Sequence, residues 1–359
     1  MEARNSSFEI LRLVAMFIII CHHFVVHGIY PFAPPHFYDI HNFSMVVCVL
    51  LFGWGGYLGN SIFVLLTGYF SIDRQVNWKR LLLLAMTMIF YAAVVAVIWK
   101  FNGWNVPHRK AILLPFFYGY NWFVACYLIF MLFVPFLNAA ILKTSSVQHL
   151  ALIILLFFVN IIVPALKGAN FMNDAPLFQF LLFYLIGAYL KRFKFHHAVL
   201  NKQLTYIKAS IVLLIMQIAM IAYTWIFQND IWRYVNLFSA CLAVTSFMIA
   251  KTNGTCCFLT VNKLAASVLG VYLIHDNELV RSYIWTNIFP NVFYLNTPYF
   301  VLFLLVKVCC VYFVCLLIDQ VRVNFIEVRV KKLLLYIGDK WTSRAVVVKR
   351  KMVVFMRDL

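Results

Sequence analysis

Long apolar stretches separated by short polar segments dominate this sequence. A helix needs about 20 mainly apolar residues to cross a bilayer, and on that measure the pattern predicts about ten transmembrane helices. We therefore predict an all-α, polytopic membrane protein, with a transmembrane domain over residues 1–320 and a basic, amphipathic cytoplasmic tail over residues 321–359. The predicted spans are residues 8–27, 46–70, 81–99, 121–141, 149–166, 175–190, 205–227, 233–250, 264–288 and 298–318.

The basic residues predict how these helices are oriented. Most of the 30 Lys and Arg residues fall in segments that the ten-helix pattern places on one side, together with both ends of the chain. An excess of Lys and Arg is typical of cytoplasmic loops, so we predict that the N- and C-termini are cytoplasmic. Because the charge lies in separate loops rather than on one soluble face, it does not indicate a nucleic-acid partner. The mixed basic and apolar tail is instead expected to lie on membrane lipid.

Composition supports the membrane assignment. The chain is 64% apolar and 12% charged, whereas soluble domains average about 45–50% and about 25%. Nine cysteines lie mostly inside the apolar stretches and show no ligand spacing with histidine. We expect free thiols, including the adjacent Cys256 and Cys257 in a predicted cytoplasmic loop.

The first span carries ionisable residues that a lipid-facing helix would not tolerate. An arginine at the bilayer centre costs about 2.5–3.5 kcal/mol, so such residues indicate a functional site. Arg12 and His23 are separated by about three helical turns, which places them on one face roughly 16 Å apart. His22 lies off that face and is expected to lie apart from the site. Arg12 alone could also be an anchor at the cytoplasmic headgroups. We expect no signal-peptide cleavage here, because Ile20 stands where a small residue would be needed.

The ninth span is the second polar anomaly. Its apolar run, residues 264–274, is too short to cross a bilayer and continues directly into His275, Asp276, Glu278 and Arg281. These side chains must therefore lie at membrane depth or in a wet cavity. As a purely structural explanation, Glu278 and Arg281 can pair at i, i+3. His275 is expected to be the functional member and to line the same cavity as His23.

Two further groups of residues have simpler explanations. His36, Asp39 and His41 lie in the first predicted outer loop without the fixed spacing of a metal motif, so we expect a plain or substrate-facing loop and no metal site. Gly55 and Gly59 in the second span are expected to allow close helix packing.

Taken together, these segments resemble the integral-membrane acyltransferase family three, whose members O-acylate sugars and cell-surface glycans. The resemblance extends over nearly the whole chain. Its motifs in the fourth, sixth and ninth spans are most similar to the subset found with capsule or exopolysaccharide O-acetylation. That subset implies a multi-pass protein of a bacterial cell membrane. The matching features are Arg12 followed by His23, FVLLTGYF in the second span, NWFVACYLIFMLFVPFLN in the fourth, FYLIGAYLKR in the sixth and VYLIHDNELVR in the ninth.

The resemblance implies transfer of an acyl group, usually acetyl from cytosolic acetyl-CoA, to a glycan hydroxyl. His23 matches the essential histidine of the family and Arg12 its partner arginine. Arg80 matches one position of a paired-arginine motif, whereas the other position, three residues earlier, is Asn77 here. This departure leaves the donor site less well defined by sequence.

Elementary chemistry agrees with these roles. Acyl-CoA is polyanionic, and Arg12, Lys79 and Arg80 supply cations for its phosphates. His23 would take the proton from the acceptor hydroxyl as general base, or would itself be acylated in a covalent relay. Trp122 and Asn121 fit a sugar-binding platform, with helix packing as the alternative explanation.

A transporter or flippase of a lipid-linked sugar is the alternative function. It would also combine about ten helices with buried charges and a basic cytoplasmic face. Inverted repeats with paired broken helices would favour transport, and the sequence shows no convincing internal duplication. We therefore favour acyl transfer.

Overall fold

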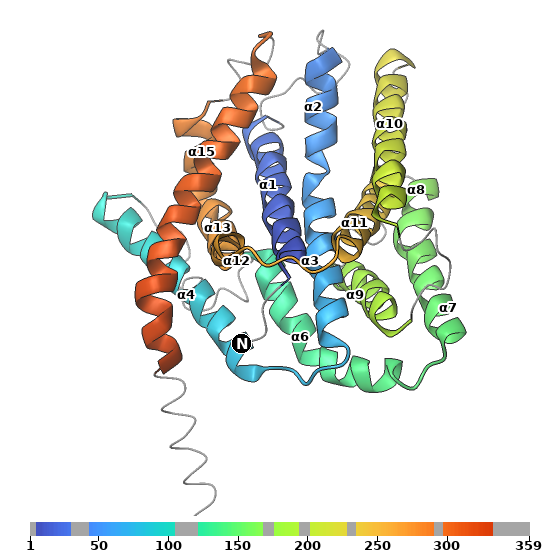
Figure 1. Ribbon diagram of the computed structural model, residues 1–359. Coiled ribbons are helices and arrows are strands. Elements are labelled where there is room, and N and C mark those ends of the chain that lie inside the picture. Colours follow the sequence, from blue (N-terminus) through green and yellow to red (C-terminus); the bar gives the residue numbers. More distant parts are fainter. Residues whose placement is uncertain are drawn as a thin grey trace, which may run out of the picture.

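A computed structural model describes residues 5–29, 43–104, 121–167, 176–193, 202–227, 235–290 and 297–332, and this part of the chain is helical without strands (Figure 1). Seven helices in it are long and apolar enough to cross a membrane. They are α1 (Ser6–Gly28), the stacked α2 (Phe43–Gly53) and α3 (Gly55–Ser71), α4 (Trp78–Phe101), α6 (Trp122–Ile141), the continuous α7 (Ser146–Phe157), η2 (Phe158–Ile162) and α8 (Val163–Lys167), α10 (Gln203–Phe227), and α15 (Phe300–Val321) continued by η7 (Arg322–Glu327).

The other three predicted spans are shorter or interrupted helices. α9 (Pro176–Arg192) has 17 residues, and α11 (Val235–Thr252) has 18. The ninth span is divided into α12 (Leu259–Ala265), α13 (Val268–His275), α14 (Glu278–Ser282) and η5 (Tyr283–Ile288). Helices therefore occupy all ten predicted ranges, but three of the ten are not long, uninterrupted spans.

α1 lies at the centre of the bundle because small residues let α3 approach it closely. The Asn5 side chain caps α1 by accepting a hydrogen bond from the Ser7 amide at 3.1 Å. A Cβ atom added at Gly55 would collide with Ile18, and one added at Gly59 would collide with Ile19. The predicted role of these glycines in helix packing is thus confirmed.

α3 also packs backbone to backbone against α9. A Cβ atom at Gly68 would strike the backbone of Tyr184, and one at Gly187 would strike the backbone of Leu65. At this crossing the two backbones lie in contact because neither glycine has a side chain to hold them apart. α3 consequently holds α1 on one side and α9 on another, which fixes the positions of the polar side chains these helices carry.

The break between α13 and α14 places three consecutive polar residues in the interior. His275, Asp276 and Asn277 are each at most 1% exposed. Asn277 caps α14 by accepting a hydrogen bond from the Leu279 amide at 3.2 Å. The predicted pair of Glu278 with Arg281 is wrong: Glu278 is exposed, and Arg281 Nη1 lies 3.1 Å from Asp276 Oδ1. Because the helix breaks at Asn277, the Arg281 side chain turns back toward Asp276, the residue before the N-cap.

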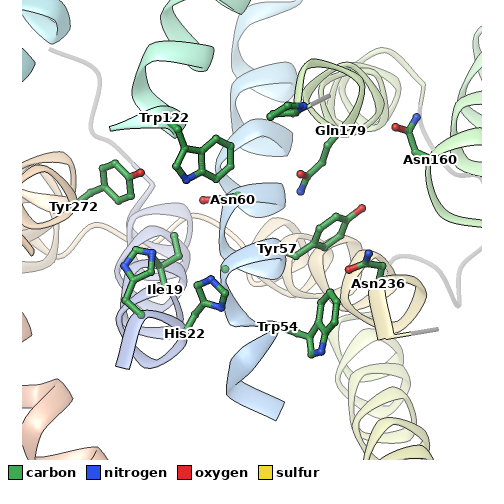
Figure 2. A pocket seen from close by; sticks show the side chains of 13 residues that line it. Ile19, His22, Trp54, Tyr57, Asn60, Trp122, Asn160, Gln179, Asn236 and Tyr272 are labelled. Carbon is green, nitrogen blue, oxygen red and sulfur yellow. The ribbon is translucent and has the colours of Figure 1, made fainter. Parts of the chain in front are cut away.

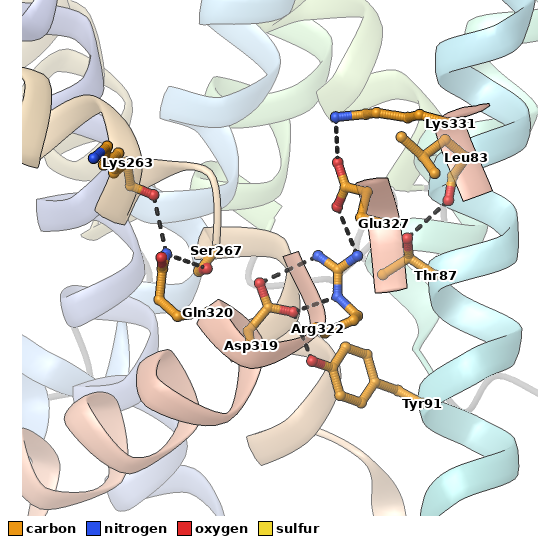
Figure 3. A network of polar contacts seen from close by, with 10 residues as sticks. All are labelled: Leu83, Thr87, Tyr91, Lys263, Ser267, Asp319, Gln320, Arg322, Glu327 and Lys331. Atoms are coloured by element: carbon orange, nitrogen blue, oxygen red, sulfur yellow. Dashed lines mark hydrogen bonds and ion pairs between the residues drawn. The ribbon is translucent and has the colours of Figure 1, made fainter. Parts of the chain in front are cut away.

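A second buried polar network surrounds the end of α15 (Figure 3). Asp319 accepts hydrogen bonds from the Tyr91 hydroxyl at 2.6 Å and from Arg322 Nε at 2.6 Å. Arg322 Nη1 also donates to Glu327 at 2.7 Å, and Glu327 pairs with Lys331 at 2.6 Å. This network joins α4 to α15, and the helix continues to residue 332, beyond the predicted domain boundary at residue 320.

Some predictions fall outside the described residues. His36, Asp39 and His41 lie in the undescribed range 30–42, and most of the tail lies in 333–359. All nine cysteines are in the described part and all are free thiols, as predicted. The orientation of the termini stays a prediction.

Candidate active site

His23 and His275 meet in the interior of the bundle. His23 is 7% exposed and His275 is fully buried, and His23 Nδ1 lies 2.9 Å from His275 Nε2. α1 and α13 carry them, 252 positions apart in the sequence. The two spans that carry the unusual polar residues of this sequence thus form one site.

The hydrogen bonds define the proton positions on both rings. His275 Nδ1 lies 2.6 Å from the Val271 carbonyl oxygen, which only accepts, so this nitrogen carries a proton. In a neutral His275 the Nε2 atom is then an acceptor, and His23 Nδ1–H donates to it. A neutral His23 consequently keeps the lone pair on Nε2. This orientation of one ring by another is typical of a general base held in place by a partner.

A carboxylate lies beside the free nitrogen of His23. Asp276 Oδ1 is 3.6 Å from His23 Nε2, which is too long for a hydrogen bond but close enough to stabilise a protonated imidazole. Asp276 is 1% exposed, and its charge is balanced by Arg281. The site can therefore accept a proton at Nε2 without leaving an isolated buried charge.

A cavity of about 290 Å³ opens next to His23. Its lining combines aromatic rings with side-chain amides from several helices, and Figure 2 shows these side chains surrounding one space. Aromatic faces and amides are the groups that bind the apolar faces and the hydroxyls of a sugar. The lining residues other than the histidines include Trp54, Tyr57, Asn60, Trp122, Asn160, Gln179, Asn236 and Tyr272.

His22 also lines this cavity, so the expectation that it would lie apart from the site was wrong. Its Nδ1 lies 2.7 Å from the Gly53 carbonyl oxygen and donates to it. Gly56 leaves room for the ring, since a Cβ atom at that position would collide with it. The adjacent histidine lies off the face of His23 on α1, but the cavity is wide enough for both side chains to reach it.

Trp122 and Asn121, the other residues predicted to bind the acceptor, differ from each other in their placement. Trp122, at the start of α6, lines the cavity and is 40% exposed. Asn121 is 1% exposed, and among the described residues its amide has no hydrogen-bond partner. The structure therefore brings Trp122 to the cavity together with His23, whereas His275 lies behind His23 and not on the cavity lining.

The residues predicted for the donor share no hydrogen bond or ion pair between their side chains in the described part of the chain. Arg12 pairs with Glu9 at 2.6 Å. Lys79 and Arg80 are exposed in the first turn of α4. Asn77, which replaces a basic residue of the family motif, caps that helix by accepting a hydrogen bond from the Arg80 amide at 3.1 Å. Local helix capping thus accounts for asparagine at this position.

Metal binding is a further chemical possibility of this site. Nitrogen atoms of His23 and His27 and a carboxylate oxygen of Asp276 lie within 4.8 Å of one another, and such ligands suit a transition metal. However, Arg281 already places a positive charge on the same Asp276 oxygen. The arrangement therefore favours proton transfer by His23 over metal binding.

Sequence reasoning did not identify most of the cavity-lining amides. Gln179 donates to Ser61 Oγ at 3.0 Å, and Asn160 donates to the Leu156 carbonyl at 2.8 Å. Each is a single polar residue in an apolar helix, without a distinctive spacing. The weak signal available was that such residues avoid lipid and face the protein interior.

The described residues form a helical membrane protein with a buried histidine beside a polar cavity. The sequence model of acyltransferase family 3, described as "Acyltransferase domain", matches residues 5–318. The chain therefore belongs to this family and is a membrane acyltransferase. Comparisons with curated proteins and with solved structures gave no match.

Proposed function

We propose that this protein is an O-acetyltransferase that moves an acetyl group from cytosolic acetyl-CoA to a hydroxyl of a glycan made for the cell surface or for export. The observation that carries the proposal is the oriented His23 beside a cavity lined by amides and aromatic rings. The family supports acyl transfer over transport of a lipid-linked sugar. The motifs shared with enzymes of capsule and exopolysaccharide O-acetylation support a glycan acceptor and a bacterial cell membrane.

The proposed chemical step uses one proton and one acyl group. The acceptor hydroxyl attacks the thioester carbonyl while His23 Nε2 takes its proton, a role that suits a neutral imidazole. A C–O bond forms and the C–S bond breaks. The CoA thiolate then leaves and recovers the proton from His23. Asp276, 3.6 Å from Nε2, stabilises the imidazolium between these two events.

The cavity supports a hydroxyl-rich acceptor. Apart from its two histidines, the lining contains no titratable group other than tyrosine among the residues that the structure describes. Amides such as Asn60 and Gln179 both donate and accept hydrogen bonds, as sugar hydroxyls require. Trp54 and Trp122 add apolar faces for stacking.

The direct test is a transfer assay with the full-length protein in lipid nanodiscs. Radiolabelled acetyl-CoA is supplied with a panel of glycans and lipid-linked sugars, and both CoA thiol release and ester-linked acetyl are measured. We expect acceptor-dependent thiol release with one ester formed per thiol. Movement of a lipid-linked sugar across the bilayer without acetyl-CoA use would support the transporter instead.

Arg12 provides a separate test of the donor. Replacing it with alanine removes a cation proposed to attract the CoA phosphates, so we expect the KM for acetyl-CoA to rise about tenfold and the KM for the acceptor to stay within twofold. Glu9→Gln, which removes the partner of Arg12 but keeps the guanidinium, is the matched control. Equal effects of Arg12→Ala on both substrates would argue against a donor role.

A further inference from the structure

Two lysines from different helices converge on one aromatic ring, away from the histidine site. Lys191 Nζ lies 5.2 Å and Lys251 Nζ 5.7 Å from the centroid of the Tyr69 ring. Lys191 belongs to the last turn of α9, Lys251 to the last turn of α11, and Tyr69 to the last turns of α3. Three of the most closely packed helices therefore end at this cluster, which we call the lysine pair.

The positive charge of the lysine pair is not neutralised by an ion pair in the described part of the chain. Lys251 Nζ donates to the Leu190 carbonyl at 2.8 Å, and Lys191 is exposed. The nearest acidic residue along α3 and its following turn is Asp73, which is exposed and makes no ion pair with either lysine. Two like charges held against one ring repel each other, and a bound anion would relieve this repulsion.

The surroundings connect the lysine pair with Arg12. Phe8 packs against Tyr69 with ring centroids 5.8 Å apart. Arg12 follows Phe8 by four residues on α1, so the two side chains occupy the same stripe of that helix. A third basic residue thus lies one helical turn from the aromatic contact that bounds the cluster.

The lysine pair and the cavity lie at opposite ends of the same helices. Gln179 lines the cavity and Lys191 follows it by twelve residues on α9, about 18 Å along the axis. Asn236 and Lys251 are related in the same way on α11, about 22 Å apart. These separations are comparable to the length of an extended phosphopantetheine arm. A donor with its phosphates at the lysine pair would have the reach to present a thioester at the level of His23.

We propose that Lys191 and Lys251, held by Tyr69, bind the phosphate groups of acyl-CoA. This inference rests on the proposed function and adds two residues to the donor site, beyond the predicted Arg12, Lys79 and Arg80. It also explains why α9 and α11 both end in a lysine directed at Tyr69. The same basic loops that predict the cytoplasmic side place this cluster where cytosolic acyl-CoA would enter.

The test is the affinity of the full-length protein for CoA and for dephospho-CoA, which lacks one phosphate, measured by calorimetry in phosphatidylcholine nanodiscs. The variants are Lys191→Gln, Lys251→Gln and the double variant. Lys143→Gln and Lys202→Gln, which remove the same charge from exposed positions, are the matched controls. We expect each single variant to weaken CoA binding about tenfold and the double variant about fiftyfold. The preference of the wild type for CoA over dephospho-CoA should shrink in the variants.

Several results would overturn the inference, each in a recognisable way. If the wild type binds CoA and the double variant binds it equally well, the lysine pair is not the donor site, while the proposed function stands. If the wild type binds no CoA, the proposed donor and this inference both fail. If the variants bind CoA as the wild type does but are no longer stabilised by phosphatidylglycerol nanodiscs, the pair binds lipid phosphate and not CoA. Equal thermal stability of variants and wild type excludes a general loss of folding.

Discussion

The two buried polar networks of this protein are built from similar residues but differ in completeness. In the network around α15, Asp319 accepts from Tyr91 and Arg322, and Arg322 continues to Glu327 (Figure 3). In the histidine network, His23 Nε2 has no hydrogen bond within the described residues, and His23 borders the cavity. A buried network in which every charge is hydrogen-bonded holds its side chains rigidly, and removing one member destabilises the fold. One that leaves a single acceptor beside a cavity is suited to take a proton from a substrate.

The surroundings of the two networks agree with this difference. Asp319 is fully buried, and Gly270 lies directly against its carboxylate, so that a side chain at that position would collide with it. Beside His23, by contrast, about 290 Å³ is open. This difference favours a structural role for Asp319 and a chemical role for His23, and substitutions at the two positions can distinguish these roles.

The largest effect is expected from His23→Ala. Removing the general base should lower kcat about 1000-fold, equivalent to about 4 kcal/mol of transition-state stabilisation. The thermal unfolding midpoint should change little, because the ring borders an open cavity. His22→Ala, which removes a neighbouring ring from the same cavity, should lower kcat less than tenfold. Ester-linked acetyl measured by NMR and unfolding followed in detergent give the two readouts. Unchanged acetylation by His23→Ala would rule out its assigned role.

Asp319→Ala should have the opposite profile. It leaves Arg322 buried without its main partner, and breaking a buried ion pair in this way costs about 3–5 kcal/mol. We expect the unfolding midpoint to fall clearly, whereas the protein that remains folded keeps its KM for both substrates. Glu327→Ala, at a less buried position of the same network, should destabilise less. A stable but inactive Asp319→Ala protein would show that the two networks are not functionally distinct.

The sequence was sufficient to predict the helical fold and the two spans that supply the histidine site. Polar groups in an apolar helix are unfavourable enough to be conspicuous, as at His23 and His275. The contact between them depends on how α1 and α13 pack, and Asp276 as the partner of Arg281 depends on a helix break that periodicity does not reveal. Only the short apolar run of the ninth span indicated that this span would be interrupted.

Other parts of the site left little trace in the sequence. Gln179 and Asn236 are isolated amides in the sequence. They line the same cavity because α3 and α9 cross closely and because of how α11 packs. Lys191 and Lys251 are typical of basic residues at the cytoplasmic ends of helices. Only their convergence on Tyr69 distinguishes them, and this is a tertiary contact between three separate helices.

A smaller effect is expected from His275→Phe, since His275 positions His23 without bordering the cavity. Loss of its Nε2 acceptor frees the His23 ring to rotate, and misplacement of a catalytic group by about 1 Å lowers rates up to about 100-fold. We expect kcat to fall about 30-fold with both KM values unchanged. His275→Gln, whose amide oxygen can accept from His23 Nδ1, should recover part of the rate. If the phenylalanine and glutamine variants were equally impaired, hydrogen bonding to His23 would not be the role of His275.

The smallest effect is expected at the cavity wall, where Gln179→Ala removes one polar contact for the acceptor. Gln179 also donates to Ser61 at 3.0 Å, so some local reorganisation will follow. A single hydrogen bond contributes about 1 kcal/mol, and the KM for the glycan should rise about fivefold. The KM for acetyl-CoA and the rate of thioester hydrolysis without acceptor should not change. Gln217→Ala, at a glutamine that is not part of the cavity lining, is the control. An equal rise in both KM values for Gln179→Ala would place the acceptor elsewhere, because a cavity specific for the glycan has no reason to alter use of the donor.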